Sequence, residues 1–256
     1  MDNPQIELAR QIIETTDTHL FLTGRAGTGK TTFLRRLRTE SPKRMVVLAP
    51  TGIAAINAGG VTIHSFFQLS FAPYIPGTKV PTSYAMTKQK IALIKSIDLL
   101  VIDEISMVRA DLLDAVDYAL RKYRRNSKPF GGVQLLLIGD LQQLAPVVKD
   151  EEWSMLKQHY PTPYFFSSNA LCNTNYVTVE LEKVYRQSDG HFLALLNEVR
   201  EGNVSQQTLD ALNQRYLPNF VPQKSDGYIQ LVTHNWQAQQ VNSHEMDKLP
   251  GQTYTY

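Results

Sequence analysis

The sequence predicts an α/β protein whose sheet is mainly parallel and flanked by helices. Apolar runs at 20–22, 45–49, 97–102 and 133–138 alternate with stretches of helical periodicity, which is the pattern of βαβ units. A glycine-rich loop joins the first run to the next helix, and acidic or amide side chains follow two later runs. Because open α/β sheets bind ligands beyond the carboxyl ends of their strands, these residues are expected to share one edge.

The phosphate-binding loop lies at residues 24–31. It fits the pattern G-x-x-x-x-G-K-[ST] and precedes a helical stretch at 32–38. Glycines let backbone N–H groups turn toward a polyphosphate, and the following helix adds the positive end of its dipole. We expect Lys30 to reach the β- and γ-phosphates of ATP, and the Thr31 hydroxyl to ligate Mg²⁺. The residues expected to bind the nucleotide here are Gly24, Ala26, Gly27, Thr28, Gly29, Lys30, Thr31 and Thr32.

The composition favours a soluble intracellular protein with a sizeable core. Of the 256 residues, 43% are apolar, and the net charge of +2 requires any basic surface to be local. No signal peptide and no membrane-spanning run are visible. The single cysteine, Cys172, fits a reducing compartment and is expected to be a small buried residue. A bacterial cytoplasmic location is favoured, and nuclear or mitochondrial locations stay open.

Further candidates lie before the phosphate-binding loop and after the second strand. A helix is predicted from the periodicity at 6–13, and Gln5 at its start is either an adenine contact or a polar helix start. Thr51, Gly52 and Asn57 follow the strand 45–49, where they either touch a second ligand or form a plain strand-to-helix turn.

The segment 61–67 combines aromatic and hydroxyl side chains. His64 and Phe66 suit stacking along a single nucleic-acid strand, and packing in the core is the alternative. The following residues, 69–87, are rich in proline and tyrosine and predict a surface insertion.

Asp103 and Glu104 end the third apolar run and indicate ATP hydrolysis. A carboxylate at this position, Asp103, holds Mg²⁺, and Glu104 is placed to orient and deprotonate the attacking water. A helix is predicted over 107–125; its basic end is interpreted as a solvated face, with a nucleic-acid footprint as the alternative. Gln143, after the fourth apolar run, is our candidate sensor of the γ-phosphate.

The rest of the chain predicts short strands and two helical regions. Strands are expected at 164–166, 176–179 and 228–233, with a helix near 188 and another at 234–248. Arg186 is one of several candidates for an arginine that enters the nucleotide site from a second lobe.

Six segments in one order resemble the petite-integration-frequency (Pif) family of DNA helicases, in the RecD-like branch of superfamily one. The resemblance runs from about Gln5 to the end of the chain. The matching segments are Gly24–Thr31, Ala49–Ala55, Thr62–Phe66, Asp103–Met107, Gly139–Leu144 and Val184–Gln187.

The resemblance implies a role for each matching position. Gln5 would contact adenine, Lys30 and Thr31 the phosphates and Mg²⁺, and Asp103 and Glu104 the metal and the water. Gln143 and Arg186 would sense the γ-phosphate. Thr51, Gly52, His64 and Phe66 would lie in strand-contacting loops, and Asn57, just beyond the matching segment, stays a DNA-contact candidate from its position after the strand.

The family also implies an organisation and an activity. A first RecA-like domain would span 1–183, with a small wedge-like insertion at about 69–87, and 184–256 would begin a second. Family members hydrolyse ATP with Mg²⁺, move 5′ to 3′ on single-stranded DNA, and unwind forks and G-quadruplexes in genome maintenance. A monomer without membrane contacts is expected.

The chain departs from the family in one respect. The late motifs of a second RecA-like domain are not visible before Tyr256, so we expect a fragment that keeps the nucleotide site and is impaired in unwinding. The alternatives are an AAA-type ATPase switch and a nucleotide-binding scaffold. An AAA-type protein usually has an asparagine after the fourth strand, whereas this chain has Gln143.

Overall fold

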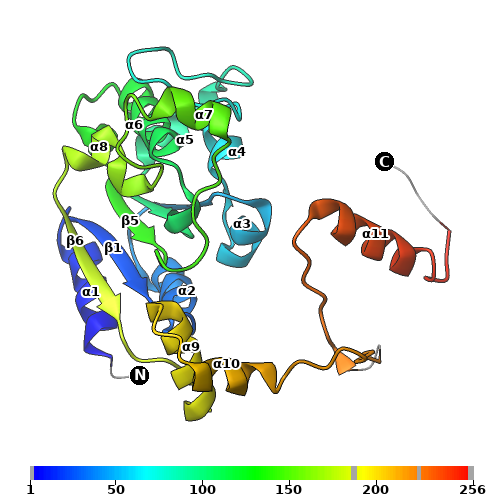
Figure 1. The fold of residues 1–256 in the computed structure, drawn as a ribbon. Coiled ribbons are helices and arrows are strands. Elements are labelled where there is room, and N and C mark those ends of the chain that lie inside the picture. The colour runs from blue at the N-terminus through cyan, green and yellow to red at the C-terminus, as the bar shows by residue number, and fades with distance from the viewer. Residues whose placement is uncertain (1–2, 186–188, 224–225, 253–256) are drawn as a thin grey trace. The chain divides into compact units, whose positions relative to one another are not determined.

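The computed structural model describes residues 3–185, 189–223 and 226–252, and Figure 1 draws them as a ribbon. They belong to two compact units, Met1–Arg200 and Glu201–Tyr256. This division falls later in the chain than residue 183, where the sequence predicts the end of the first domain. The assignment of the two domains stays a prediction.

Six parallel strands form the sheet of the first unit, in the order β3-β2-β4-β5-β1-β6. The predicted α/β class with a parallel sheet is confirmed. The order places β5 between β1 and β4, so the carboxyl ends of these three strands are neighbours. The strands are β1 (His19–Gly24), β2 (Met45–Ala49), β3 (Val61–Thr62), β4 (Leu99–Ile102), β5 (Gln134–Ile138) and β6 (Tyr176–Leu181).

Helices cover both faces of this sheet (Figure 1). Successive side chains of a strand point to opposite faces: Leu20 and Leu22 join the core beneath α1 and α2, and Phe21 joins the core beneath α6. Burial on both faces explains why the strands read as continuous apolar runs. The helices of this unit are α1 (Pro4–Thr15), α2 (Lys30–Glu40), α3 (Gly52–Ala58), α4 (Ile63–Phe67), α5 (Lys88–Ser96), α6 (Ala110–Arg124), α7 (Asp150–Leu156), α8 (Asn169–Cys172) and α9 (Gly190–Glu201).

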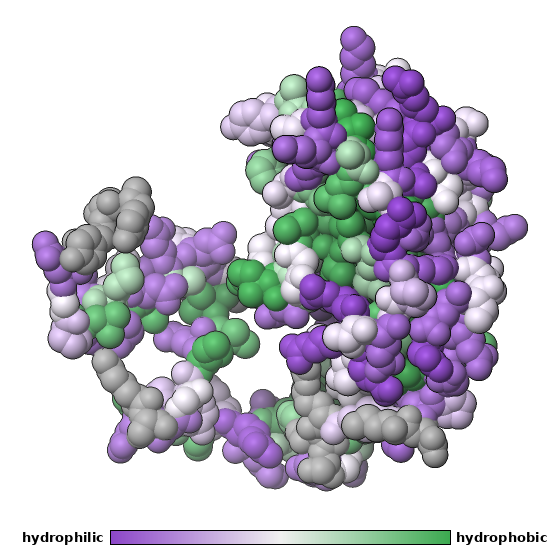
Figure 2. All heavy atoms as spheres, turned by 180° about the vertical axis from the view of Figure 1, so that it is seen from behind, coloured by the Kyte–Doolittle hydropathy of each residue, from purple (hydrophilic) through white to green (hydrophobic). Residues whose placement is uncertain are grey.

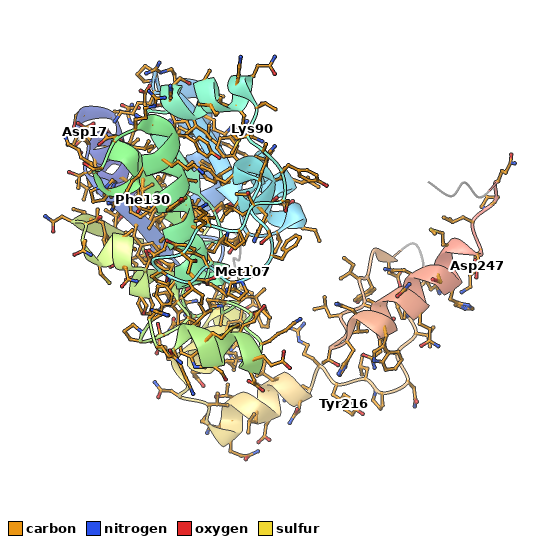
Figure 3. All side chains as sticks on the ribbon, turned by 90° about the horizontal axis from the view of Figure 1, so that it is seen from above. Asp17, Lys90, Met107, Phe130, Tyr216 and Asp247 are labelled. Carbon is orange, nitrogen blue, oxygen red and sulfur yellow. The ribbon has the colours of Figure 1, made fainter. Side chains whose placement is uncertain are left out.

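The long helix α6 begins three residues after the predicted start at Met107. The chain first makes a short 3₁₀ turn, η1 (Ile105–Met107), and a second one, η2 (Pro129–Gly132), follows the helix. Figure 3 labels Met107 and Phe130, one from each turn. Phe130 is fully buried, so η2 anchors the end of the helix to the core.

Residues 69–87 contain no helix or strand longer than the isolated bridge between Leu69 and Thr82. Leu69, Tyr74 and Val80 are nevertheless buried and belong to the core beneath α6. The Tyr74 backbone N–H also donates to the Asp111 carboxylate, at 3.0 Å. The insertion therefore packs on the domain instead of standing clear of it.

Two predicted strands are wrong. At 164–166, Tyr164 makes only an isolated bridge with Arg109, and Phe165 and Phe166 belong to a 3₁₀ turn, η3 (Phe165–Ser167). The Phe165 ring turns inward against Phe21, with ring centroids 5.3 Å apart. Residues 228–233 form no strand, and Leu231 is 90% exposed. No strand of the described part of the second unit lies beside them, and an unpaired strand leaves its backbone groups without partners.

Cys172 is exposed, which corrects the expectation that it is buried. It ends the four-residue helix α8, in which Ala170 and Leu171 face the core instead. So short a helix buries only one side.

In the described residues of the second unit, the chain forms the helices α10 (Gln206–Asn213) and α11 (Asn235–Met246). The helix predicted at 234–248 is thus confirmed as α11, which has no buried residue. Ser205 caps α10 by accepting a hydrogen bond from the Thr208 backbone N–H, at 3.1 Å.

Candidate nucleotide site and nucleic-acid surface

The phosphate-binding loop has the backbone that its glycines permit. Gly24, Gly27 and Gly29 have φ of 144°, 80° and 98°. At Gly24 a Cβ would lie 2.5 Å from the Leu181 carbonyl oxygen of the neighbouring strand β6, so only glycine fits there. Thr28 is fully buried, and its hydroxyl donates to the Arg25 carbonyl at 2.8 Å, which closes the loop on itself.

Lys30 lies within this loop and is surrounded by acids. Its ammonium donates to the carbonyl oxygens of Gly24 and of Arg25, the latter at 3.0 Å. Burial lowers the pKa of Lys30, and the charges of Asp140, Glu104 and Asp103 oppose that shift. The structure therefore brings together the predicted Lys30, Asp103 and Glu104, and adds Asp140.

Asp103 and Glu104 follow β4 and differ in their surroundings. Burial, helped by the charge of Glu104, raises the pKa of Asp103 from 3.8 to about 6. Glu104 has a φ of 52°, a left-handed conformation that costs a residue with a side chain roughly 1–3 kcal/mol. Strain of this kind is concentrated at functional sites, and here it sets the direction in which the Glu104 side chain leaves the strand.

The donor set suits Mg²⁺ bound together with a nucleotide. Thr31, in the first turn of α2, and Asp103 offer hard oxygen ligands, as Mg²⁺ prefers. Among the described residues, no group of three or more His, Cys, Asp or Glu could hold a metal ion by itself. This agrees with the usual Mg²⁺ site of P-loop proteins, in which one or two side chains act with phosphates and water.

The sensor loop, residues Gly139–Leu144, follows β5 between the other two strand ends. Gln143 is exposed, and its side-chain amide donates to Asp140 at 2.8 Å. Asp140 also forms a bidentate ion pair with Arg200 of α9, and both N–O distances are 2.6 Å. Asp140 was absent from our candidates although it lies three residues before Gln143; Arg200 had no motif to identify it.

Tyr185 borders the phosphate-binding loop and was also missed. Its backbone N–H donates to the Gly27 carbonyl at 2.8 Å, and its hydroxyl accepts from the Asn3 side chain at 3.4 Å. A Cβ at Gly29 would lie 3.9 Å from both Ile6 and Tyr185, so the start of α1 and this tyrosine meet at the loop. Its position within the Val184–Gln187 segment is the sequence signal for Tyr185.

Gln5 and Arg186 are the two other residues that the sequence predicts to contact the nucleotide. Gln5 is in the first turn of α1, half-buried, and its backbone N–H donates to the Asn3 side chain at 3.1 Å. Gln5 therefore adjoins Ile6, which approaches Gly29 of the phosphate-binding loop together with Tyr185. Arg186 lies outside the described residues.

The predicted nucleic-acid contacts follow β2 and β3, and the structure places them at or within the short helices α3 and α4 rather than in loops. Thr51 caps α3 by accepting from the Ala54 backbone N–H at 3.2 Å, and Thr51, Gly52 and Asn57 are exposed. His64 lies against Phe71, with ring centroids 4.7 Å apart, and Phe71 is 82% exposed. An exposed aromatic ring of this kind is a suitable surface for a base.

Phe66 does not fit the expectation that it contacts a nucleic acid. It is 4% exposed and packs edge-on against Phe67, with ring centroids 4.9 Å apart. Lys90 lies 5.1 Å from the ring centroid. The alternative of a core residue is the correct one for Phe66, because α4 turns it toward the sheet.

Apolar side chains also reach the surface of this unit. In the view of Figure 2, mostly hydrophilic side chains surround a band of apolar ones. Ile53 and Ile56 of α3 are 76% and 79% exposed, which is unusual for two isoleucines so close together. They lie in the same helix as Asn57 and extend the surface that the nucleic-acid candidates define.

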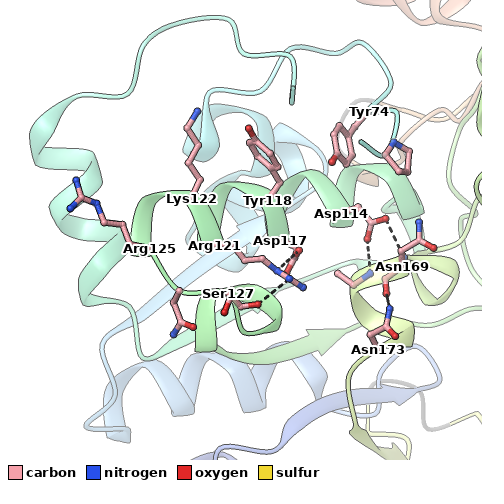
Figure 4. A pocket seen from close by; sticks show the side chains of 13 residues that line it. Tyr74, Asp114, Asp117, Tyr118, Arg121, Lys122, Arg125, Ser127, Asn169 and Asn173 are labelled. Carbon is pink, nitrogen blue, oxygen red and sulfur yellow. Dashed lines mark hydrogen bonds and ion pairs between the residues drawn. The ribbon is translucent and has the colours of Figure 1, made fainter. Parts of the chain in front are cut away.

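A groove of about 780 Å³ runs along the outside of α6 (Figure 4). Its acids are already paired: Asp114 accepts from Asn169 and Ala170 backbone N–H groups, and Asp117 pairs with Arg121 at 2.8 Å. None of the residues around Lys30 lines it. The groove is therefore separate from the nucleotide site.

The fold and the site define a P-loop nucleotide-binding domain of the RecA-like class. A parallel sheet places the phosphate-binding loop, the Asp103–Glu104 pair and the sensor loop at adjacent strand ends. More particularly, the chain belongs to the PIF1-like helicase family, whose model matches residues 2–210. This confirms the resemblance found in the sequence.

Individual relatives agree with the family model. The chain is 34% identical over 244 residues to ATP-dependent DNA helicase PIF1 of Saccharomyces cerevisiae (strain YJM789), covering 93% of this chain and 27% of that protein. It is 34% identical over 247 residues to the PIF1 helicase of Homo sapiens, covering 93% of this chain and 35% of the relative. The chain thus spans about a third of the length of these curated relatives.

A solved structure of a Pif1 helicase from Bacteroides, in complex with ADP-AlF3 and single-stranded DNA, has the same fold. Its TM-score is 0.91 with 37% sequence identity, and the match covers 98% of this chain and 58% of that one. In the described part of our chain, no helix has the length and apolar character needed to cross a membrane.

Proposed function

We propose that this chain is the nucleotide-binding part of an ATP-dependent DNA helicase that moves along single-stranded DNA. One observation carries the proposal. The charges of Asp103, Glu104 and Asp140 act on Lys30 of the phosphate-binding loop, and Gln143 is hydrogen-bonded to Asp140. A scaffold that only binds a nucleotide needs neither the strained backbone of Glu104 nor the Gln143 amide in the loop after β5. The family relationship supports the same reading.

The residues divide the work of ATP hydrolysis between them. The loop N–H groups and Lys30 bind the phosphates, and Thr31 and Asp103 would hold Mg²⁺, which would supply positive charge to the phosphates. Glu104 orients the attacking water and accepts its proton. Gln143 registers the γ-phosphate, and Arg186 supplies a positive charge to it. Gln5 contacts the adenine edge, and the Tyr185 ring borders the base.

Single-stranded DNA would lie along the surface formed by α3, α4 and the start of the insertion that follows α4. Thr51, Gly52 and Asn57 offer small or polar contacts to its backbone, and His64 with Phe71 offers an aromatic surface to a base. Exposed Phe71, and not buried Phe66, is the ring that we assign to base stacking. We extend the proposal to 5′-to-3′ movement, to forks and G-quadruplexes as substrates in genome maintenance, and to a monomeric, intracellular protein.

The chain alone is expected to bind ATP and DNA but to unwind poorly, because unwinding needs two lobes that close around ATP. Binding is measured with a fluorescent ATP analogue and, separately, by the anisotropy of a labelled oligothymidylate. Lys30→Ala should weaken nucleotide binding at least tenfold and leave DNA binding within threefold, whereas Phe71→Ala should do the reverse. Equal effects of both variants on both ligands would refute the assignment of separate nucleotide and DNA sites. Robust unwinding by the isolated chain would refute the expectation that it unwinds poorly.

A further inference from the structure

The Asp140 carboxylate is the most heavily bonded group of the sensor loop. It is 2% exposed, and each of its oxygens accepts two hydrogen bonds. One oxygen takes the Arg200 Nη2 and the Gln142 backbone N–H, at 2.6 and 3.1 Å. The other takes the Arg200 Nη1 and the Gln143 side-chain amide, at 2.6 and 2.8 Å. The carboxylate has no further capacity to accept hydrogen bonds, so Gln143 and Arg200 share one acceptor.

Arg200 lies in α9, whose side chains are half-buried or exposed. No residue of α9 is buried, yet the Arg200 side chain is only 18% exposed. A guanidinium that meets a carboxylate through two parallel bonds fixes both distance and orientation, which a lysine does not. The ion pair is therefore a specific attachment of α9 to the end of β5.

The same pair acts on the phosphate-binding lysine. Asp140 raises the pKa of Lys30 more than the other acids around it, whereas Arg200 lowers it. The three charges thus interact as cation, anion and cation, with Asp140 common to both interactions. Removing Arg200 takes away two of the four hydrogen bonds that hold the Asp140 carboxylate beside Gln143.

We propose that Arg200 is a positioning residue. It holds the Asp140 carboxylate in place, Asp140 in turn orients the Gln143 side chain toward the γ-phosphate, and α9 is thereby linked to the nucleotide site. The link makes the orientation of Gln143 depend on where α9 lies. Because Arg200 is the point of contact, a movement of α9 is transmitted through Asp140 to the sensor loop. This inference rests on the proposed function, since it assigns Gln143 to the γ-phosphate.

The first test measures ATP hydrolysis with and without single-stranded DNA in the complete polypeptide that carries this sequence. Arg200→Gln should lower the DNA-stimulated kcat at least tenfold and change KM for ATP less than threefold. Arg200→Lys should give an intermediate kcat, because it keeps the charge and loses the two-bonded geometry. Arg125→Gln, which removes an exposed arginine beside the α6 groove, is the matched control and should stay within twofold of the wild type.

A double-mutant cycle separates positioning from a purely structural role. If Arg200 acts through Asp140, Asp140→Asn combined with Arg200→Gln should have the kcat of Asp140→Asn alone. Urea unfolding of the same four proteins reports whether the ion pair forms. A coupled effect on unfolding together with an unchanged kcat in Arg200→Gln would make the pair structural only and would overturn the inference, as would additive losses of kcat.

Nucleotide preference gives a readout that does not depend on DNA stimulation. A displaced Gln143 loses contact with the γ-phosphate only, so Arg200→Gln should reduce the preference for a non-hydrolysable ATP analogue over ADP at least fivefold. If the wild type shows no DNA stimulation, the proposed function fails, and this ratio still decides the role of Arg200. An unchanged ratio overturns the inference.

Discussion

The substitution Asp103→Asn should stabilise the protein in the absence of metal, by an amount that depends on pH. The folded protein raises the pKa of Asp103 from 3.8 to about 6, so folding disfavours the charged form. Stability is lost as pH rises from the unfolded pKa to the folded one, and the full loss is present above pH 6. A shift of about two pKa units corresponds to about 3 kcal/mol at pH 8 and, by the same relation, to about 1 kcal/mol at pH 4.5.

Asparagine imitates the protonated form and removes this cost at every pH. Urea unfolding of Asp103→Asn and the wild type in metal-free buffer should therefore give a difference in free energy of unfolding that grows from about 1 to about 3 kcal/mol between pH 4.5 and pH 8. Asp98→Asn is the matched control with the opposite sign, because the Arg44 guanidinium holds the pKa of Asp98 at about 2. An equal difference at both pH values, or a less stable Asp103→Asn at pH 8, would refute the reasoning.

Three further substitutions test the site and its support. Glu104→Gln in the complete polypeptide should slow steady-state hydrolysis by about 10²–10⁴-fold and leave ATP affinity within threefold; normal hydrolysis would remove Glu104 as the base. Gly139→Ala places a Cβ 2.8 Å from the Ile105 side chain and should lower the free energy of unfolding in urea by about 1–3 kcal/mol; an unchanged free energy of unfolding would contradict this close packing. Asp114→Ala leaves buried donors such as the Tyr160 hydroxyl, now 2.9 Å away, without an acceptor; we expect a loss of about 3–5 kcal/mol in thermal or urea unfolding with nucleotide affinity unchanged, and a smaller loss would point to rearrangement around α8.

The sheet and the centre of the site are predictable because their signals are local. A buried parallel strand is a continuous apolar run, and the loop that binds phosphate needs glycines at fixed spacing. The run at 45–49 matches β2 residue for residue, and Asp103 lies directly after β4 as expected. Sequence position alone is enough to place such residues at one edge once the sheet is known to be parallel.

The features that the sequence did not predict depend on contacts between residues that are far apart along the chain. Nothing near Arg200 in the sequence indicates that its partner is Asp140, sixty residues earlier. Phe66 looks like a stacking residue until the direction of α4 is known, and Leu231 has the apolar character of a strand without a neighbour to pair with. These features depend on tertiary neighbours, which periodicity and propensity do not encode.

The most direct test of the central claim is the rate of phosphate release at saturating MgATP, with and without saturating single-stranded DNA. The complete polypeptide should hydrolyse ATP, DNA should stimulate the rate at least tenfold, and Glu104→Gln should abolish both rates. A rate that single-stranded DNA leaves unchanged at every salt concentration would contradict the account and would favour a nucleotide switch or scaffold.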